Sequence, residues 1–489
     1  MNNWIFRAIL SFWFLLSLSA CGGGGGGGST PVPPPPPPPP ISLDQKVRNV
    51  INAAGLTGDP SAGRTLPSIN DPLAQLGKKL FFSKSLSGDM DTACASCHHP
   101  ALGGGDGLSL PVGVGAVNPD VVGPGRTRAD GLPNVGRHSQ TVFNVGLYDA
   151  GLFWDSRVES IGKEAGNNGS ASGIRTPDTP LNAADNAAGP NLVAAQARFP
   201  VAIEGEMRGT LLPGASDQAV RDRIAARLGD YGDGQGELTV NTWLDEFRTA
   251  FVSSETAENL VTFDNIALAL GEYQRSMVFV DNPWRSYVNG DNNAISMTAK
   301  QGALLFLQAA GGQGDDRGLG CADCHSGDFF TDEDHHTIGF PQIGIGKGDE
   351  APGDGDFGRE QQTADVAHRF RFRTPSLLNF SVTAPYTHSG AYETFNATTT
   401  HYVVPRDTVD EFFDVVGGPC GLAQFAGHVD CPNLFVNSRD YTNLAVNKAL
   451  AEQTSDPDHT FPDITSSPVG DAPLVEAFLL SLTDNCVSD

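Results

Sequence analysis

Apolar residues recur at helical spacing in two segments of the chain, and each segment precedes a short cysteine-rich stretch. In DPLAQLGKKLFF, residues 71–82, the side chains of Leu73, Leu76 and Leu80 fall on one stripe, and the initial Asp-Pro pair is typical of a helix start. SMTAKQGALLFLQ repeats this pattern from Ser296. The pattern therefore predicts a repeated unit of helix, loop and cysteine motif.

Two further segments have helical periodicity. TFDNIALALGEYQRSMVF, residues 262–279, lies between the two cysteine motifs. DAPLVEAFLLSLTD, residues 471–484, places Leu474, Phe478 and Leu482 four residues apart. This spacing predicts a buried helix near the C-terminus that closes the pocket of the second cysteine motif.

The remaining sequence favours loops over strands. Long strand-like alternation is scarce and the chain contains 58 Gly and 34 Pro, so we predict a mainly α fold whose helices are joined by long irregular loops. A length of 489 residues exceeds what one hydrophobic core usually serves. We place a domain boundary near residue 290, which gives predicted domains at residues 44–290 and 291–489.

The N-terminal residues are typical of an export signal. Residues 1–21 carry one positive charge and then an apolar run that is too short to span a membrane. Leu18 to Cys21 match a bacterial lipobox, which predicts lipid anchoring through Cys21; an ordinary small-residue cleavage site is the alternative. Residues 22–43 contain seven consecutive Gly and eight consecutive Pro, and this composition predicts an extended tether.

The charge balance limits the partners. Acidic residues number 57 and basic residues 31, which argues against a nucleic-acid partner because phosphates attract Lys and Arg. An acidic surface is suited to steering a basic electron-carrier protein, although it can equally serve solubility alone.

Two stretches, CASCHHP and CADCH, contain the CxxCH pattern that c-type haem attachment requires. In this chemistry both thiols bind one haem and the following histidine ligates its iron. Zinc would need further Cys or His ligands at finger-like spacing, and no second CxxC lies near either motif. The predicted haem-binding residues are Cys94, Cys97 and His98 in the first motif and Cys321, Cys324 and His325 in the second.

Three cysteines remain after Cys21 and the motifs are assigned. In an oxidising periplasm, Cys420 and Cys431 are the predicted disulfide, and Cys486 is left unpaired.

The methionines restrict the sixth ligand of the second haem. No methionine occurs after Met297, so the sequence that follows the second motif offers no thioether. This haem must use His, Tyr, another group or no sixth ligand, and a His or Tyr ligand would lower its potential relative to Met.

Several blocks resemble one family. The chain is similar in these blocks to the bacterial di-haem cytochrome c peroxidases and their relative MauG. The blocks are LGKKLFF before the first motif, LFWDSR, FRTPSLLNFSVTAPYTHSG at residues 372–390, and the two CxxCH motifs in this order. The resemblance implies two class-I cytochrome c-like haem domains. It also implies that the N-terminal haem is the peroxide site and that the C-terminal haem transfers electrons.

The resemblance also implies roles for individual residues. In MauG the sixth ligand is a Tyr seventeen residues after the proline of APY, which corresponds to Tyr402; His401 is the alternative. The spacing of the family's peroxide pocket identifies Gln196, Pro200 and Glu206, with Glu206 as general acid/base and Gln196 as a hydrogen-bonding partner of peroxide.

Trp154 in LFWDSR corresponds to the tryptophan that lies between the two haems of the family, although core packing alone would also place it in the interior. The Gly- and Asn-rich insertion that follows Trp154 is predicted to be a surface loop.

The sequence departs from the family at a loop that blocks the resting first haem. VGVGAV has Val114 where typical peroxidases have a blocking histidine, so the first haem is expected to be open at rest unless His99 or His138 replaces it.

A calcium ion between the haems is left open. His138 stands where the family has an Asn ligand, and imidazole is a poor calcium ligand, whereas Thr383 and Pro385 retain the backbone part of the site. MauG also has a tryptophan before its second motif, and DRGLG lacks it here, which argues against maturation of a quinone cofactor.

Together these observations predict a periplasmic di-haem peroxidase that reduces hydrogen peroxide. The expected donor is a small periplasmic cytochrome c or cupredoxin, and a homodimer is left open because family members are often dimers. A MauG-like oxidase of aromatic groups on a partner and a non-catalytic di-haem carrier are the alternatives.

Overall fold

The computed structural model describes most of the chain after the predicted tether, namely residues 41–312, 317–344, 355–456 and 469–487. The predicted signal peptide, Cys21 and the tether up to residue 40 lie outside the described residues. The chain forms two units, residues 1–41 and 42–489, and every element below belongs to the second.

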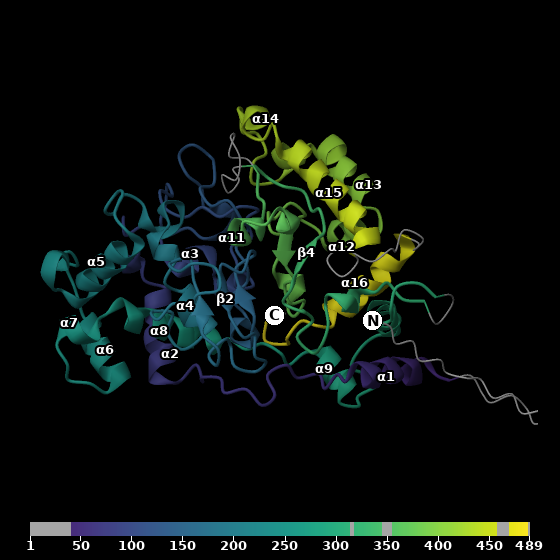
Figure 1. Ribbon diagram of the computed structural model, residues 1–489, viewed down its shortest axis with the longest axis horizontal. Helices are drawn as coiled ribbons and strands as arrows, with labels where there is room; N and C mark the ends of the chain where they lie inside the picture. The colour runs from purple at the N-terminus through teal and green to yellow at the C-terminus, as the bar shows by residue number, and fades with distance from the viewer. Residues whose placement is uncertain (1–40, 313–316, 345–354, 457–468, 488–489) are drawn as a thin grey trace, which may run out of the picture. The chain divides into compact units, whose positions relative to one another are not determined.

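Short helices joined by irregular segments dominate this unit (Figure 1). The helices are α1 (Leu43–Ala54), α2 (Pro72–Phe81), α3 (Cys94–Cys97), α4 (Leu192–Gln196), α5 (Asp217–Gly229), α6 (Trp243–Phe251), α7 (Ala257–Leu260), α8 (Phe263–Arg275), α9 (Pro283–Val288), α10 (Met297–Leu307), α11 (Glu360–Thr363), α12 (Phe395–Val403), α13 (Pro405–Glu411), α14 (Cys431–Leu434), α15 (Ser438–Ser455) and α16 (Ala472–Leu480). The prediction of a mainly α-helical chain is confirmed.

The helix starts follow the sequence signals closely. Ser296 is the N-cap of α10, and its hydroxyl accepts a hydrogen bond from the Ala299 amide. Asp71 occupies the N-cap position of α2 and Pro72 its first turn, but the Asp71 carboxylate accepts from the Ser68 amide instead of capping the helix.

The strands are two or three residues long and form two small sheets. One sheet is antiparallel in the order β1 (Gly151–Leu152), β2 (Val158–Ser160), β3 (Ile174–Arg175), and the other pairs β4 (His335–Thr337) with β5 (Arg371–Arg373) in antiparallel register.

The insertion after Trp154 is more than a surface loop, and that prediction is wrong in part. Asn168 is buried in it and donates a hydrogen bond of 2.7 Å to the Tyr148 carbonyl oxygen. The insertion also supplies β3. Because its polar side chains satisfy buried backbone groups, a Gly- and Asn-rich composition does not here indicate exposure.

The helix before the first CxxCH crosses α8 at a glycine. A Cβ atom on Gly77 of α2 would lie 1.8 Å from the Ala269 carbonyl oxygen of α8. One turn further along, the rings of Phe81 and Tyr273 pack edge to face with their centroids 5.2 Å apart. The absence of a side chain at Gly77 therefore allows the two helix backbones to touch.

The helix before the second CxxCH repeats this crossing. A Cβ atom on Gly302 of α10 would lie 1.9 Å from the Leu474 carbonyl oxygen of α16. The rings of Phe306 and Phe478, each four residues further on, lie 5.2 Å apart. The two halves of the chain thus contain the same pair of crossed helices with the same glycine and aromatic positions.

Two large clusters of buried residues surround these crossings. The first core contains residues of α2, α5 and α8, including Phe81, Ile224 and Tyr273. The second core contains residues of α9, α10 and α16, including Trp284, Phe306 and Phe478. Figure 1 shows α2, α5 and α8 on one side of this unit and α9, α15 and α16 on the other.

Each end of this unit packs against the core of the opposite half of the chain. Val47 and Ile51 of α1 are buried in the second core, while Val487 packs against the first. The boundary near residue 290 stays a prediction, but the chain crosses it at both ends.

The predicted disulfide between Cys420 and Cys431 is present, and Cys486 is free and exposed. Among the described residues, no helix combines the length and the hydropathy needed to cross a membrane.

Candidate functional site

One cavity connects the two CxxCH motifs. Cys94, Cys97 and His98 line it at one end, and Cys321, Cys324 and His325 line it at the other. Its other walls are mainly apolar and come from both cores, including Phe81, Leu270, Phe306 and Leu479. The side chain of Leu479 confirms that the C-terminal helix helps to close the second pocket. A planar apolar cofactor at each motif would find such a lining favourable.

Each motif histidine is held by a backbone carbonyl group. His98 Nδ1 lies 2.9 Å from the Gln140 oxygen, and His325 Nδ1 lies 3.1 Å from the Phe330 oxygen. Since a carbonyl only accepts, Nδ1 carries the proton and Nε2 keeps its lone pair, which is the state of a metal-ligating imidazole. Burial lowers the pKa of His98, and it lowers that of His325 to about 4, so both rings stay neutral.

Two of the motif cysteines, Cys94 and Cys321, are partly buried thiols. Burial raises the pKa of the Cys94 and Cys321 thiols to about 12. They are not activated thiolates of the kind that a redox dithiol requires. This environment disfavours a redox role for these two cysteines.

The three residues identified for the peroxide pocket line the cavity together. Gln196 ends α4, Pro200 begins a 3-10 turn at Pro200–Ala202, and Glu206 lies in a π-helical turn at Glu204–Arg208. These consecutive turns bring side chains that are ten residues apart in sequence to the lining of one cavity. The side chain of Glu206 is 19% exposed, and its Oε1 atom lies 3.9 Å from Arg157 Nη2.

Trp154 joins segments that belong to the two motifs. Its indole Nε1 donates a 3.0 Å hydrogen bond to the His138 carbonyl oxygen, two residues before the Gln140 group that holds His98. Its own carbonyl oxygen accepts from the Arg373 amide of β5 at 2.8 Å. Trp154 also lines the cavity, and its hydrogen bonds connect the segment that holds His98 with strand β5.

The environments of Tyr402 and His401 differ. Tyr402 lines the cavity beside Cys321 and Cys324, and burial holds its pKa far above the usual value for a phenol. His401 is fully buried; its Nε2 donates to the Ile338 oxygen at 3.1 Å, and its Nδ1 accepts from the Tyr392 hydroxyl at 2.9 Å. Both ring nitrogens of His401 are thus occupied.

The two histidines considered as substitutes for the blocking ligand differ in position. His99 accepts a hydrogen bond from the Ala101 amide and does not line the cavity. His138 lines it, but its Nδ1 donates to the Leu108 oxygen at 2.9 Å, and it precedes the segment that holds His98. His138 therefore lines the same cavity as Gln196 and Glu206, whereas His99 does not.

Sequence reasoning missed His388. It is buried, lines the cavity, and stacks on Phe372 with ring centroids 3.8 Å apart, while its Nε2 finds no partner in the described protein. A buried ring nitrogen without a partner fits a cavity that receives a polar group, such as the carboxylates of a haem. Its position in THSG carries no separate signal.

Sequence reasoning also missed His336, which lies beside the second motif. Cys324 Sγ, an Asp332 carboxylate oxygen and a His336 ring nitrogen lie within 4.8 Å of one another. His336 Nε2 pairs with Asp332 at 2.7 Å. The set has the chemistry of a metal site, but Cys324 would enter a thioether when haem attaches, which removes its thiolate.

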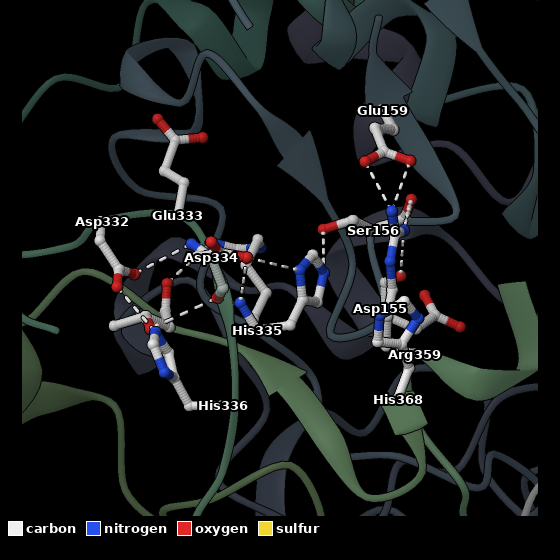
Figure 2. A network of polar contacts seen from close by, with 12 residues as sticks. Asp155, Ser156, Glu159, Asp332, Glu333, Asp334, His335, His336, Arg359 and His368 are labelled. Atoms are coloured by element: carbon white, nitrogen blue, oxygen red, sulfur yellow. Dashed lines mark hydrogen bonds and ion pairs between the residues drawn. The ribbon is translucent and has the colours of Figure 1, made fainter. Parts of the chain in front are cut away.

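A buried ionic network centred on Asp155 fixes the segment that follows Trp154. Asp155 is 1% exposed; Arg137 Nη1 lies 2.7 Å from its Oδ2, and Arg137 also pairs with Asp356 at 2.6 Å. Figure 2 shows Arg359 facing the Glu159 carboxylate, with which it forms two hydrogen bonds, and His335 beside Ser156.

The comparisons with known proteins agree with this geometry. Residues 71–293 match the model of the family described as di-haem cytochrome c peroxidase. MauG of Methylorubrum extorquens is 29% identical over 67% of this chain and 67% of its own length. Cytochrome c551 peroxidase of Pseudomonas aeruginosa is 28% identical over 66% and 69%, respectively. The chain therefore resembles the di-haem cytochrome c peroxidases and MauG over about two thirds of its length.

It is an oxidoreductase of the peroxidase type, and its family implies two c-type haems. The fold agrees with this assignment. The crystal structure of the diheme peroxidase BthA from Burkholderia thailandensis matches 87% of this chain and 89% of its own, with a TM-score of 0.52 and 19% identity.

Proposed function

We propose that this protein reduces hydrogen peroxide to water with electrons that a small redox protein delivers through the second haem. The observation that carries the proposal is the position of Gln196, Pro200 and Glu206, which line the same cavity as His98. An open first haem next to a carboxylate is suited to peroxide chemistry.

The residues that would hold the haems are the four motif cysteines, His98 and His325, with Tyr402 as sixth ligand of the second haem. The haem iron, when bound, supplies the peroxide-binding and electron-carrying chemistry. Tyr402 is favoured over His401 because its side chain lines the cavity, whereas hydrogen bonds occupy both nitrogens of His401.

Glu206 moves a proton in this proposal. Its carboxylate accepts the proton of the inner peroxide oxygen and returns it to the outer oxygen, which leaves as water. Two electrons and two further protons reduce the inner oxygen to a second water. Gln196 holds the bound peroxide through its side-chain amide.

Trp154 provides the route between the two haems. Its ring lies between the segments that position them, and an indole in this place shortens the distance that electrons must cross. The network around Asp155 would keep the ring in place.

We infer two cytochrome c-like domains, at residues 44–290 and 291–489. The matched crossings at Gly77 and Gly302 support this division, since each half then has the same helix pair beside its own haem motif.

We place the protein on the periplasmic side of the envelope, anchored only through a lipid on Cys21. The disulfide between Cys420 and Cys431 supports an oxidising compartment. The donor is then a small periplasmic cytochrome c or cupredoxin, and two copies of the chain can form a dimer.

Calcium is not required in this proposal. Position 138, where the family has a calcium ligand, carries an imidazole whose Nδ1 already donates to the Leu108 oxygen. Such a nitrogen donor suits calcium poorly.

The proposal is tested with Glu206→Gln in the haem-loaded protein. We expect steady-state peroxide reduction with an artificial one-electron donor to fall about 10²-fold, because the amide cannot accept and return the proton. Glu204→Gln is the matched control, since Glu204 lies in the same turn but is exposed and does not line the cavity.

Wild-type turnover in Glu206→Gln would return Glu206 to a structural role. A ferric spectrum without a high-spin component, unchanged by peroxide, would instead favour the non-catalytic carrier. Oxidation of aromatic groups on a partner in preference to peroxide turnover with the donor would favour the MauG-like oxidase.

A further inference from the structure

Arg157 points a positive charge at the proposed acid/base. Its side chain lines the cavity and is 13% exposed, and its Nη2 atom lies 3.9 Å from Glu206 Oε1. The guanidinium lies over the ring of Phe153, with Cζ 3.6 Å from the ring centroid. A cation in this partly buried position interacts more strongly with charge in the cavity than it would in water.

The backbone that carries Arg157 is rigidly held. The Arg157 amide donates to Asp155 Oδ1 at 3.2 Å, and the guanidinium Nη1 atom lies 3.5 Å from the same oxygen. Arg359 donates to the carbonyl oxygens of Asp155 and Ser156 at 3.0 and 3.1 Å, in the region shown in Figure 2. Arg157 therefore stands in a fixed position immediately before the short strand β2, which begins at Val158.

The hydrogen-bonding capacity of Arg157 is largely unused. A guanidinium has five N–H donors. Within the described part of the chain, this side chain donates no hydrogen bond, and its carboxylate neighbours lie at 3.5 and 3.9 Å, beyond ordinary hydrogen-bond length. By contrast, the Arg137 guanidinium makes two bonds to Asp356 and one to Gln361.

We propose that Arg157 is a further catalytic residue of the peroxide site, whose guanidinium donates hydrogen bonds to the outer peroxide oxygen as the O–O bond breaks. The inference rests on the proposed function, because it assumes that peroxide binds beside Glu206. This role explains why a guanidinium group with unused N–H donors lines the cavity between Phe153 and Glu206.

The step balances without an added reactant. Glu206 takes the proton from the inner oxygen; the O–O bond breaks with its electron pair going to the outer oxygen, which then receives that proton and leaves as water. Arg157 keeps its protons throughout and stabilises the negative charge that develops on the outer oxygen. Two electrons from the donor protein and two protons from solvent complete the reduction of the inner oxygen.

The test compares Arg157→Ala and Arg157→Lys in the haem-loaded full chain. We expect the second-order rate constant for the reaction with hydrogen peroxide, followed by stopped-flow absorbance, to fall about 10²-fold in Arg157→Ala. The fall in Arg157→Lys should be smaller, because lysine keeps the positive charge. A fall is still expected, because lysine lacks the planar set of guanidinium N–H donors. Haem content and ferric spectrum should stay at wild-type values.

Chemical rescue separates catalysis from a structural role. Added guanidinium ions at non-denaturing concentration should restore part of the rate in Arg157→Ala and none in Glu206→Gln. Arg369→Ala is the control: Arg369 also lies over a phenylalanine, with Cζ 4.1 Å from the Phe357 ring centroid, and pairs with Glu360, but it does not line the cavity. Its rate should equal that of the wild type.

The outcomes are distinct. Wild-type rates in both Arg157 variants, with a slow Glu206→Gln, would overturn this inference and leave the proposed function intact. Wild-type rates in all three would overturn both. A slow Arg157→Ala that loses haem, or that guanidinium does not rescue, would show that Arg157 holds a haem or the fold instead. If Arg157→Ala yields no folded protein, Arg157→Lys and Arg157→Gln decide in the same assay.

Discussion

Gly302 and Leu474 touch through their backbones, since a Cβ atom on Gly302 would lie 1.9 Å from the Leu474 carbonyl oxygen. We expect Gly302→Ala to force α10 and α16 apart and to destabilise the second core by about 2 kcal/mol, the usual cost of overpacking. Thermal melting and retention of the second haem would show this. Gln301→Ala, on the exposed face of the same helix, should melt like the wild type.

Two haems should be bound covalently. Intact mass after maturation in a host competent for haem c attachment should show two haem additions, because both CxxCH motifs are complete and their histidines are held in the ligating tautomer. Replacement of Cys321 and Cys324 by Ala should leave one. Two additions in that variant would contradict the assignment of the second motif.

Tyr402→Phe should remove the sixth ligand of the second haem. Electron paramagnetic resonance of the ferric protein should then lose a low-spin signal, since phenylalanine offers no oxygen to iron. Tyr392→Phe is the control, because Tyr392 is also buried but donates to His401. Loss of the same signal in His401→Ala, with Tyr402→Phe unchanged, would transfer the ligand role to His401.

Gln424 should restrain the loop near the first haem motif. It lies in the segment that the disulfide closes, and its side-chain amide accepts from the Leu110 amide at 3.0 Å and donates to the Leu110 oxygen at 2.7 Å. We expect Gln424→Ala to speed hydrogen exchange in residues 108–115 about tenfold or more, as two lost hydrogen bonds allow. Equal protection in the variant and wild type would show that other contacts restrain this loop.

The sequence predicted those features that are encoded locally or by a fixed spacing. The cap at Ser296, the disulfide between Cys420 and Cys431, and the helix before each motif all depend on neighbouring residues or on simple pairing. Gln196 and Glu206 were identified through a spacing shared with the family, and the structure brings both to the cavity wall.

Other features depend on tertiary contacts that no local pattern records. His388 and Arg157 stand out because both line the cavity and carry side-chain nitrogen atoms without a hydrogen-bond partner in the described protein, and that is a property of the assembled site. Asn168 was expected at the surface, yet it is buried because backbone carbonyls distant in sequence accept its hydrogen bonds. Composition alone cannot distinguish such an asparagine from an exposed one.

The packing of α1 has a consequence for anyone who divides this protein for study. A recombinant fragment ending near residue 290 would contain the first haem motif, but it would separate Val47 and Ile51 from α10 and expose their apolar side chains to water. The complementary fragment would lack the helix that covers its core. The two fragments should therefore both be prone to aggregation. Attaching the residues of α1 to the second fragment should prevent this.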